Sequence, residues 1–291
     1  MGFRTIIIKS KYKLEYSMNH LIARNENEYK EINLDEINSL IIQSTQVAIT
    51  SSLLANLAEK NINVVICDEK ANPTSELINY NGIYDSRDKL IKQFSIGREE
   101  IAIVWKEIIK EKIKNQRRII TKYKRDDKII SLFNGYIDGT CDDDITNREG
   151  HAAKVYFNTM FGKDFTRSNP CDENIFLDYG YTILLSCFNR SIRSIGYYPE
   201  LGIHHIGKTN PFNLSCDLME PLRPLVDSYI FNKTVNIKNF KKEYVDMLNL
   251  MVKYDGDSMY LENAIRLYCK MIMSALTTKQ IEKVKFIEYG I

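Results

Sequence analysis

Several features that would narrow the class of this protein are missing from its sequence. None of its six cysteines forms a CxxC pair, which argues against a zinc ribbon. No stretch approaches the roughly 20 apolar residues of a membrane-spanning helix. The short apolar run at 5–8 is followed by Lys9 and Lys11, so it lacks the long core of a signal peptide. We therefore expect a cytoplasmic protein with no membrane contact, whose thiols are reduced and mostly buried.

The composition is otherwise that of an ordinary globular protein. The 291 residues suffice for one large domain or two ordinary ones. The net charge is only +2, but residues 87–128 contain 14 Lys or Arg against 7 Asp or Glu, a local excess of +7. Such a stretch fits a partner with a phosphate backbone. It fits a solvated helix face with intrahelical ion pairs equally well.

The hydrophobic pattern changes from strand-like to helical near residue 80. Before this point, short runs of β-formers recur at the spacing of a sheet or sandwich, interrupted by one predicted helix over 51–61. The expected strands are 5–9, 13–17, 20–24, 31–35, 37–43 and 63–68, and 80–85 is a predicted linker. Beyond it, an apolar stripe from Ile101 to Ile113, which includes Lys112, predicts a helix with a basic opposite face. Further helices are predicted over 147–161, 175–194, 221–231, 238–252 and 257–275.

Two of only four histidines, His204 and His205, are adjacent in a loop bounded by glycines. Because adjacent side chains of a regular element cannot both point at one site, we expect one functional histidine and one bystander. Asp217 and Glu220 follow and would share one face of a helical turn. The alternative is that both acids stabilise the start of a helix whose first residue is Pro221.

A further acid, Glu149, lies at the start of a predicted helix. Thr146 and Glu149 match the S/T-x-x-E pattern, so a capping box is the structural alternative for this glutamate. Two glutamates, a histidine and an aspartate in reserve would form an oxygen-rich set that suits Mg²⁺ or Mn²⁺ better than zinc. Such an ion neutralises phosphate charge and activates an attacking hydroxyl or water. The spacing alone leaves the metal site and the structural alternatives open.

Four segments, in this order, closely resemble the CRISPR-associated integrase family "Cas one": NREGHAAKVYFNTMFG (147–162), LDYGYTILLS (177–186), LGIHH (201–205) and FNLSCDLMEPLRPLVD (212–227). The resemblance extends over the whole chain and is strongest to members from type II systems. It implies an α+β fold with two domains. The first, 1–80, would be an N-terminal β-sandwich used for dimerisation, and the second, 81–291, a larger all-α helical domain that carries metal-dependent catalysis.

The resemblance also implies roles for individual residues. The metal ligands would be Glu149 from NREGH, His205 from GIHH and Glu220 from DLMEP, with Mg²⁺ or Mn²⁺ as the cofactor. Asp217 would be a further catalytic acid, and His204 the bystander. Most members from other system types have aspartate as the last ligand, so Glu220 fits the type II variant.

The implied function is a DNA endonuclease and integrase that inserts captured DNA fragments into a CRISPR array, an antiviral defence. The 3′-hydroxyl of the fragment would attack a phosphodiester at the edge of a repeat. Two homodimers would assemble on a dimer of a smaller partner, "Cas two", giving a heterohexamer. The resemblance to type II members adds other adaptation proteins and the effector nuclease as candidate partners.

Charge alone, without a motif, selects five candidate contacts to the DNA backbone: Lys112, Arg117, Arg118, Lys122 and Lys124. Two other functions remain as alternatives. In one, the protein is a catalytically silent DNA-binding scaffold whose basic helices bind DNA and whose acids are helix caps. In the other, it is a metallohydrolase of small phosphoesters, which the basic stretch disfavours.

Overall fold

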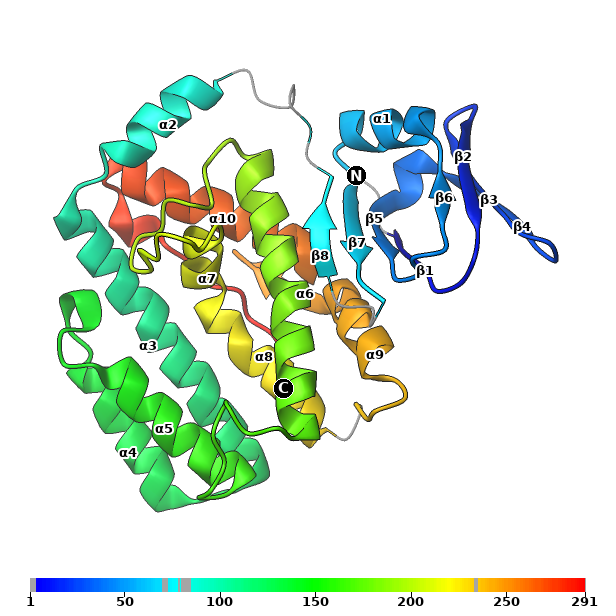
Figure 1. Ribbon diagram of the computed structural model, residues 1–291. Coiled ribbons are helices and arrows are strands. Elements are labelled where there is room, and N and C mark those ends of the chain that lie inside the picture. Colours follow the sequence, from blue (N-terminus) through cyan, green and yellow to red (C-terminus); the bar gives the residue numbers. More distant parts are fainter. Residues whose placement is uncertain (1–3, 70–72, 78, 80–84, 233–234, 291) are drawn as a thin grey trace. The chain divides into compact units, whose positions relative to one another are not determined.

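The computed structural model describes residues 4–69, 73–77, 79, 85–232 and 235–290. The chain forms two compact units, Met1–Tyr84 and Asp85–Ile291, and each is considered by itself. Sheets dominate the first unit and helices the second (Figure 1), which confirms a mixed α/β fold. The predicted linker at 80–85 lies outside the described residues except for Asp85. Among the described residues, no helix is both long and apolar enough to cross a membrane.

The first unit contains two four-stranded sheets, with strand orders β1-β5-β7-β8 and β4-β3-β2-β6. Strand β5 and strand β7 pair in parallel, and α1 lies between them in the chain, as a parallel pair requires a crossover connection. A two-residue turn with positive φ at Met18 and Asn19 joins β2 to β3. The elements are β1 Arg4–Ile8, β2 Lys13–Ser17, β3 His20–Arg24, β4 Tyr29–Asn33, η1 Leu34–Glu36, β5 Ile37–Ile42, β6 Ala48–Ile49, α1 Ser51–Glu59, β7 Asn63–Cys67 and β8 Pro73–Glu76.

Both sheets and α1 contribute to one hydrophobic core in this unit. Leu14, Leu21, Leu40, Leu53 and Val64 are all fully buried in it. The core explains why α1 forms where it does: Thr50 caps the helix, and Leu53 and Leu57 then fall on its buried face.

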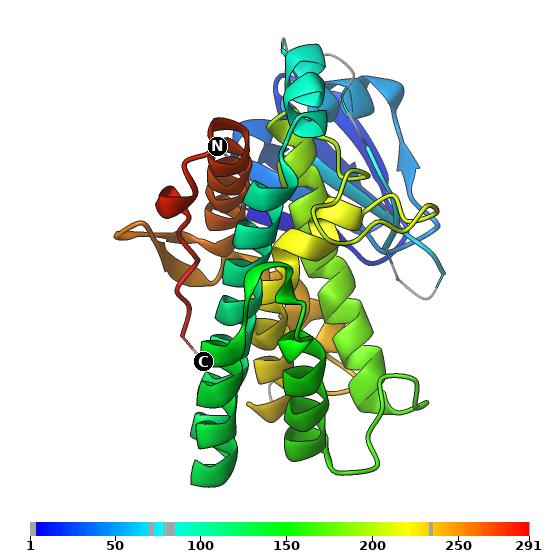
Figure 2. The same ribbon diagram turned by 90° about the vertical axis from the view of Figure 1, so that its left-hand side faces the viewer.

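In the second unit, α3 is the central helix. It packs against α4, α5 and α8 along its length and also contacts α10 (Figure 2). The apolar stripe predicted from Ile101 to Ile113 is its buried face. The helices are α2 Ser86–Phe94, α3 Arg98–Tyr123, α4 Asp127–Gly139, η2 Asp142–Asp144, α5 Arg148–Phe161, α6 Asp172–Ser194, α7 Asn213–Met219, η3 Glu220–Leu222, α8 Arg223–Phe231, α9 Phe240–Asp246, η4 Met247–Asn249, α10 Leu261–Thr278 and η5 Ile281–Lys283.

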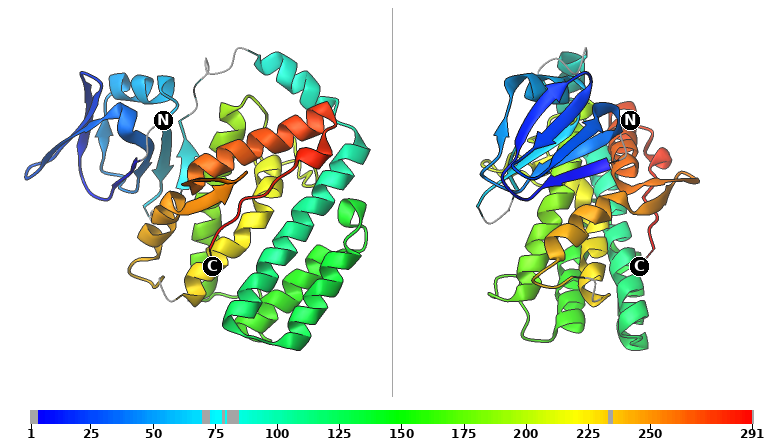
Figure 3. Two further views of the ribbon diagram at one scale, coloured as in Figure 1. Left: turned by 180° about the vertical axis from the view of Figure 1, so that it is seen from behind. Right: turned by 90° about the vertical axis from the view of Figure 1, so that its right-hand side faces the viewer.

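The prediction of an all-α second domain is wrong at 251–260. Strands β9 (Met251–Tyr254) and β10 (Asp257–Tyr260) form an antiparallel hairpin there, which contacts α10 and is drawn in orange in the view from behind (Figure 3, left). Its two turn residues, Asp255 and Gly256, both have positive φ, as the tight Asp-Gly hairpin turn requires. The helix predicted over 238–252 is therefore shorter, and the last long helix begins at Leu261.

Candidate metal centre

Glu149 lies in the first turn of α5, but it does not cap that helix. Asn147 is the N-cap, and its side chain accepts the backbone N–H of Gly150 at 3.2 Å. Asp144 accepts the backbone N–H of Glu149 at 2.9 Å. The structural alternative for Glu149, a capping box with Thr146, is therefore excluded. With the helix N-terminus satisfied by other side chains, the Glu149 carboxylate is directed to α3 instead.

Glu220 lies where α7 passes into η3. Pro221 has no backbone N–H, so it cannot continue the α-helical hydrogen-bond ladder, and the chain makes a 3₁₀ turn at this point. Asn115 of α3 donates to the carbonyl oxygen of Pro221 at 3.0 Å, and Tyr289 donates to the same oxygen at 3.1 Å. These bonds fix the turn against α3 and hold the buried Glu220 side chain on its inner side.

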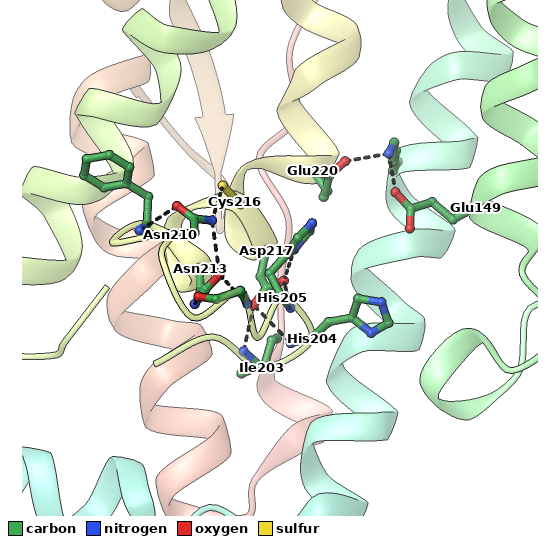
Figure 4. Close-up of polar contacts among 12 residues, drawn as sticks. Glu149, Ile203, His204, His205, Asn210, Asn213, Cys216, Asp217 and Glu220 are labelled. Carbon is green, nitrogen blue, oxygen red and sulfur yellow. Dashed lines mark hydrogen bonds and ion pairs between the residues drawn. The ribbon is translucent and has the colours of Figure 1, made fainter. Parts of the chain in front are cut away.

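Lys112 joins these two acids. Its ammonium lies 2.6 Å from Oε1 of Glu149 and 2.5 Å from Oε2 of Glu220. In Figure 4 the dashed lines from Glu149 and Glu220 meet at this nitrogen. The Lys112 side chain is only 10% exposed, so it is not available on the surface as a contact to a DNA backbone. The structure therefore contradicts that prediction for Lys112, and the cause is its position on the apolar stripe of α3.

The loop that carries His205 is held by one buried carboxylate. Asp217 in α7 accepts the backbone N–H groups of Ile203, His204 and His205 at 2.7, 3.1 and 3.0 Å. It also accepts a hydrogen bond from Nδ1 of His205 at 2.6 Å (Figure 4). Because Nδ1 carries the proton, Nε2 of His205 retains a lone pair that can bind a metal. Asp217 thus positions His205 rather than joining the two glutamates.

His204 faces another direction. Its ring stacks on the buried Trp105 ring with centroids 4.1 Å apart and an interplanar angle of 5°. Its Nδ1 lies 3.7 Å from Oδ1 of Asp143. These contacts are structural, in agreement with a bystander role.

Charge is closely balanced around Glu220. Burial raises its pKa, but Arg223, with Nε 2.8 Å from Oε1, and Lys112 outweigh burial, so the pKa lies below its usual value. Burial likewise lowers the pKa of Lys112, but Glu220 and Glu149 outweigh it and the pKa is raised. The hydrogen bond that His205 donates to Asp217 is the main cause that raises the pKa of His205. The negative charges of Glu220 and Glu149 add to this rise.

Lys112, Glu149 and Glu220 line a cavity of about 240 Å³, together with Arg167, Arg223 and Asp227. None of these last three residues was predicted from the sequence. The Arg167 guanidinium lies 5.4 Å from the Tyr181 ring centroid and pairs with Asp178. Arg223 occupies the RP pair that follows the DLMEP motif, so it could have been found by its spacing, whereas Arg167 lies in a loop without a recognisable pattern.

Asp227 is fully buried in this cavity wall and accepts a hydrogen bond from the Tyr181 hydroxyl at 2.5 Å. Burial raises its pKa to about 6 from 3.8. At a pH between these two pKa values the folded state binds more protons than the unfolded state, so the free energy of unfolding falls as pH rises.

Asp227→Asn removes this titration. In EDTA, the free energy of unfolding of the variant minus that of wild type should therefore rise by about 2 kcal/mol from pH 4.5 to pH 7.5. Urea unfolding at several pH values measures this; a constant difference would contradict the assignment.

Glu149, His205 and Glu220 fit a divalent metal, although the ammonium of Lys112 lies between the two carboxylates. Two carboxylates and one imidazole nitrogen are a donor set for Mg²⁺ or Mn²⁺. The two carboxylates already converge on a positive charge, the ammonium of Lys112. In this conformation, no three His, Cys, Asp or Glu side chains within the described ranges are grouped closely enough to hold a metal.

The four other predicted contacts to DNA lie in and just after the C-terminal half of α3. Arg118 is exposed and donates to the carbonyl oxygen of Tyr289 at 2.7 Å. Arg117 is half-buried and pairs with Asn134 of α4. Lys122 and Lys124 are exposed. All four therefore remain candidates for a contact to a phosphate backbone.

Comparisons with known proteins identify the family. The family model for CRISPR associated protein Cas1 matches residues 5–264. The CRISPR-associated endonuclease Cas1 of Neisseria meningitidis is 28% identical, with 99% of this chain and 97% of the relative covered. A chain of a Cas6-RT-Cas1–Cas2 complex has a similar fold, with TM-score 0.74, 18% identity and coverage of 98% of this chain and 36% of that longer chain. A casposase bound to an integration product gives TM-score 0.72, 19% identity and coverage of 95% and 91%. The chain belongs to the Cas1 family.

Proposed function

We propose that this chain is a metal-dependent DNA endonuclease and integrase that inserts captured DNA fragments into a CRISPR array. The observation that carries the proposal is the convergence of Glu149 and Glu220 on one cation, with His205 held nearby by Asp217. Membership of the Cas1 family and the endonuclease name of the Neisseria relative support it. The similar casposase is bound to an integration product, which supports strand transfer as the reaction.

The proposed reaction is a phosphoryl transfer. The 3′-hydroxyl of the fragment loses its proton and attacks a phosphorus atom at the edge of a repeat. A new P–O bond forms, the bond from that phosphorus to the neighbouring 3′-oxygen breaks, and the released oxygen takes up a proton. With water as the nucleophile, the same site would cleave DNA. No covalent enzyme intermediate is required.

Glu149, Nε2 of His205 and Glu220 would hold Mg²⁺ or Mn²⁺. When bound, the ion supplies Lewis-acid stabilisation of the charge that develops on the phosphate and on the leaving oxygen. Asp217 keeps the proton of His205 on Nδ1, which orients the ring and leaves Nε2 as the donor. Arg223 holds the Glu220 carboxylate through its Nε, and Arg167 in the cavity wall can face a phosphate.

The proposed partners follow from the family and from surface charge. Arg117, Arg118, Lys122 and Lys124 would bind backbone phosphates of the fragment or of the repeat. The first unit would form the homodimer, and two such dimers would assemble on a Cas2 dimer, in keeping with the Cas1–Cas2 complex whose chain has a similar fold. The proposed system is of type II. The proposed location is the cytoplasm, where the array would be.

One observation favours the alternative, a catalytically silent DNA-binding scaffold. Lys112 satisfies both glutamates without a metal, so the cluster would also serve as a buried structural ion network. The two functions differ in the chemistry they predict, because a scaffold needs no metal and is indifferent to the loss of one carboxylate as long as the fold is kept.

The experiment is strand transfer on a branched DNA that mimics a half-integrated fragment, with Mg²⁺, Mn²⁺ or EDTA. We expect rejoining by the wild type to require the metal. Glu220→Gln should lower the rate by at least about 100-fold, since even residues behind a metal ligand contribute 10–100-fold. DNA affinity, measured by fluorescence anisotropy, should change little. Glu111→Gln is a matched control, because Glu111 pairs with Lys114 at 3.4 Å on the same helix as Lys112.

Equal turnover of wild type and Glu220→Gln, or turnover in EDTA, would contradict the proposal. Because the family acts with a smaller partner, the assay is run with and without a Cas2 protein. DNA binding without strand transfer in both conditions, for every metal, would leave the scaffold as the function. Hydrolysis of a small phosphoester without activity on DNA would favour a metallohydrolase.

A further inference from the structure

Lys112 is the one cation that contacts both proposed glutamate ligands among the described residues. It reaches them from α3, where its neighbours on the buried face, Ile108, Ile109 and Ile113, are all fully buried. Asn115, one turn further on, binds the η3 backbone and so keeps α3 and Glu220 at a fixed spacing. The ammonium is thus delivered to the glutamates by a rigid helix and not by a mobile surface segment.

A divalent ion that contacts both carboxylates would compete there with this ammonium. Mg²⁺ or Mn²⁺ would bind the carboxylate oxygens at about 2.1 Å, whereas the ammonium now lies 2.6 and 2.5 Å from one oxygen of each glutamate. Both cations would then lie within a few ångströms in a site largely screened from water, where like charges repel strongly. Repulsion between the two cations therefore favours withdrawal of the ammonium when a metal contacts both acids.

We propose that Lys112 is a built-in competitor of the catalytic metal, which holds Glu149 and Glu220 in the metal-free protein and withdraws when the ion enters. The inference rests on the metal site proposed above and adds a control on its loading. The cavity of about 240 Å³ that Lys112 lines together with Glu149 and Glu220 gives the withdrawn ammonium room to move. The competition lowers the affinity for metal, so the site is protected from loading when free ions are scarce.

A purely structural role for Lys112 leads to a different expectation. If Lys112 served only to stabilise the fold, a neutral side chain would lower stability without a gain in metal affinity, since removing one partner of a buried ion pair leaves the other charge uncompensated. The distinguishing quantity is therefore the metal affinity itself, measured without DNA and without turnover.

The test is a titration of the metal-free 291-residue chain with Mn²⁺, monitored by calorimetry and by the electron paramagnetic resonance signal of free Mn²⁺. Lys112→Met and Lys112→Gln should bind Mn²⁺ at least about 10-fold more tightly than wild type, a difference of 1.4 kcal/mol. Lys112→Arg keeps the charge and should show no such gain. Lys114→Met is the matched control, because it removes a 44% exposed lysine that pairs with Glu111 on the same helix.

Affinities of the neutral variants equal to or below that of wild type would overturn the inference. If Glu220→Gln abolishes Mn²⁺ binding in that case, the proposed metal site still stands and only the competition fails. If neither wild type nor any variant binds Mn²⁺ in this site, the proposed metal-dependent function itself fails. Thermal unfolding provides a second readout: Mn²⁺ should raise the Tm of the neutral variants more than that of wild type, and an equal rise would count against competition.

Discussion

Replacing Asp217 with asparagine is expected to lower the rate of strand transfer by about 100-fold, the upper end of the range for a group behind a metal ligand. Asp217 is fully buried and accepts four hydrogen bonds, three from backbone N–H groups of the loop and one from His205. Asparagine has only one side-chain oxygen that can accept these hydrogen bonds. Its NH₂ group would face N–H donors that now bind the second oxygen of Asp217. The His205 loop would then lose its anchor and the imidazole its fixed orientation.

The same substitution should lower the free energy of unfolding by about 2–4 kcal/mol, because it leaves buried donors unpaired. A loss of stability alone does not show that Asp217 orients the imidazole, so the readout is the Mn²⁺ affinity of the folded variant well below its Tm. His204→Ala is the matched control, since its side chain stacks on Trp105 and is 40% exposed. It should keep most of the activity. Equal losses in His204→Ala and His205→Ala would show that the histidines are assigned wrongly.

Replacing Trp105 with alanine is expected to cost about 3–5 kcal/mol of stability, the range for a large aromatic side chain in a packed core. Trp105 is fully buried in α3 and lies under the histidine loop, with His204 stacked on it and His205 edge-on at 6.3 Å. The cavity left behind would lie between α3 and that loop. Urea unfolding of the full chain, followed by circular dichroism, measures the loss.

Trp105→Phe is the control for this prediction. Nε1 of Trp105 is buried and has no hydrogen-bond partner, so phenylalanine removes an unsatisfied donor while it keeps an aromatic surface for His204. We expect it to cost clearly less than alanine. An alanine variant that unfolds within about 1 kcal/mol of wild type would show that the histidine loop does not depend on this packing.

The short motifs of the sequence predicted more of the site than the periodicity did. Glu149 and Glu220 lie far apart in the chain, and the structure brings them to one cation. That juxtaposition follows from the resemblance to a family and not from any local spacing. The local pattern at Glu149 pointed to a capping box, because the S/T-x-x-E pattern does not reveal that Asn147 adopts a left-handed conformation and caps the helix one residue later.

Lys112 shows a different limit. Its place on the apolar stripe of α3 indicates burial, whereas its charge indicates contact with DNA. The structure agrees with the stripe, because the Lys112 side chain is buried. The partner that makes burial of a lysine tolerable, Glu220, lies over 100 residues away, so no local pattern could reveal it. The hairpin at 251–260 is not among the sequence predictions, although Asp255–Gly256 is a typical pair for a tight hairpin turn. The apolar spacing of the flanking segments also fits a helix, and it decides the prediction there.

The most direct test of the central claim is the position of the metal. Crystals of the chain with a DNA substrate and Mn²⁺, measured near the manganese absorption edge, would give an anomalous difference map. We predict one strong peak in contact with Glu149, His205 and Glu220, with the Lys112 ammonium withdrawn from the two carboxylates. An ammonium still bound between the glutamates, with Mn²⁺ elsewhere or absent at saturating concentration, would contradict both the metal centre and the function built on it.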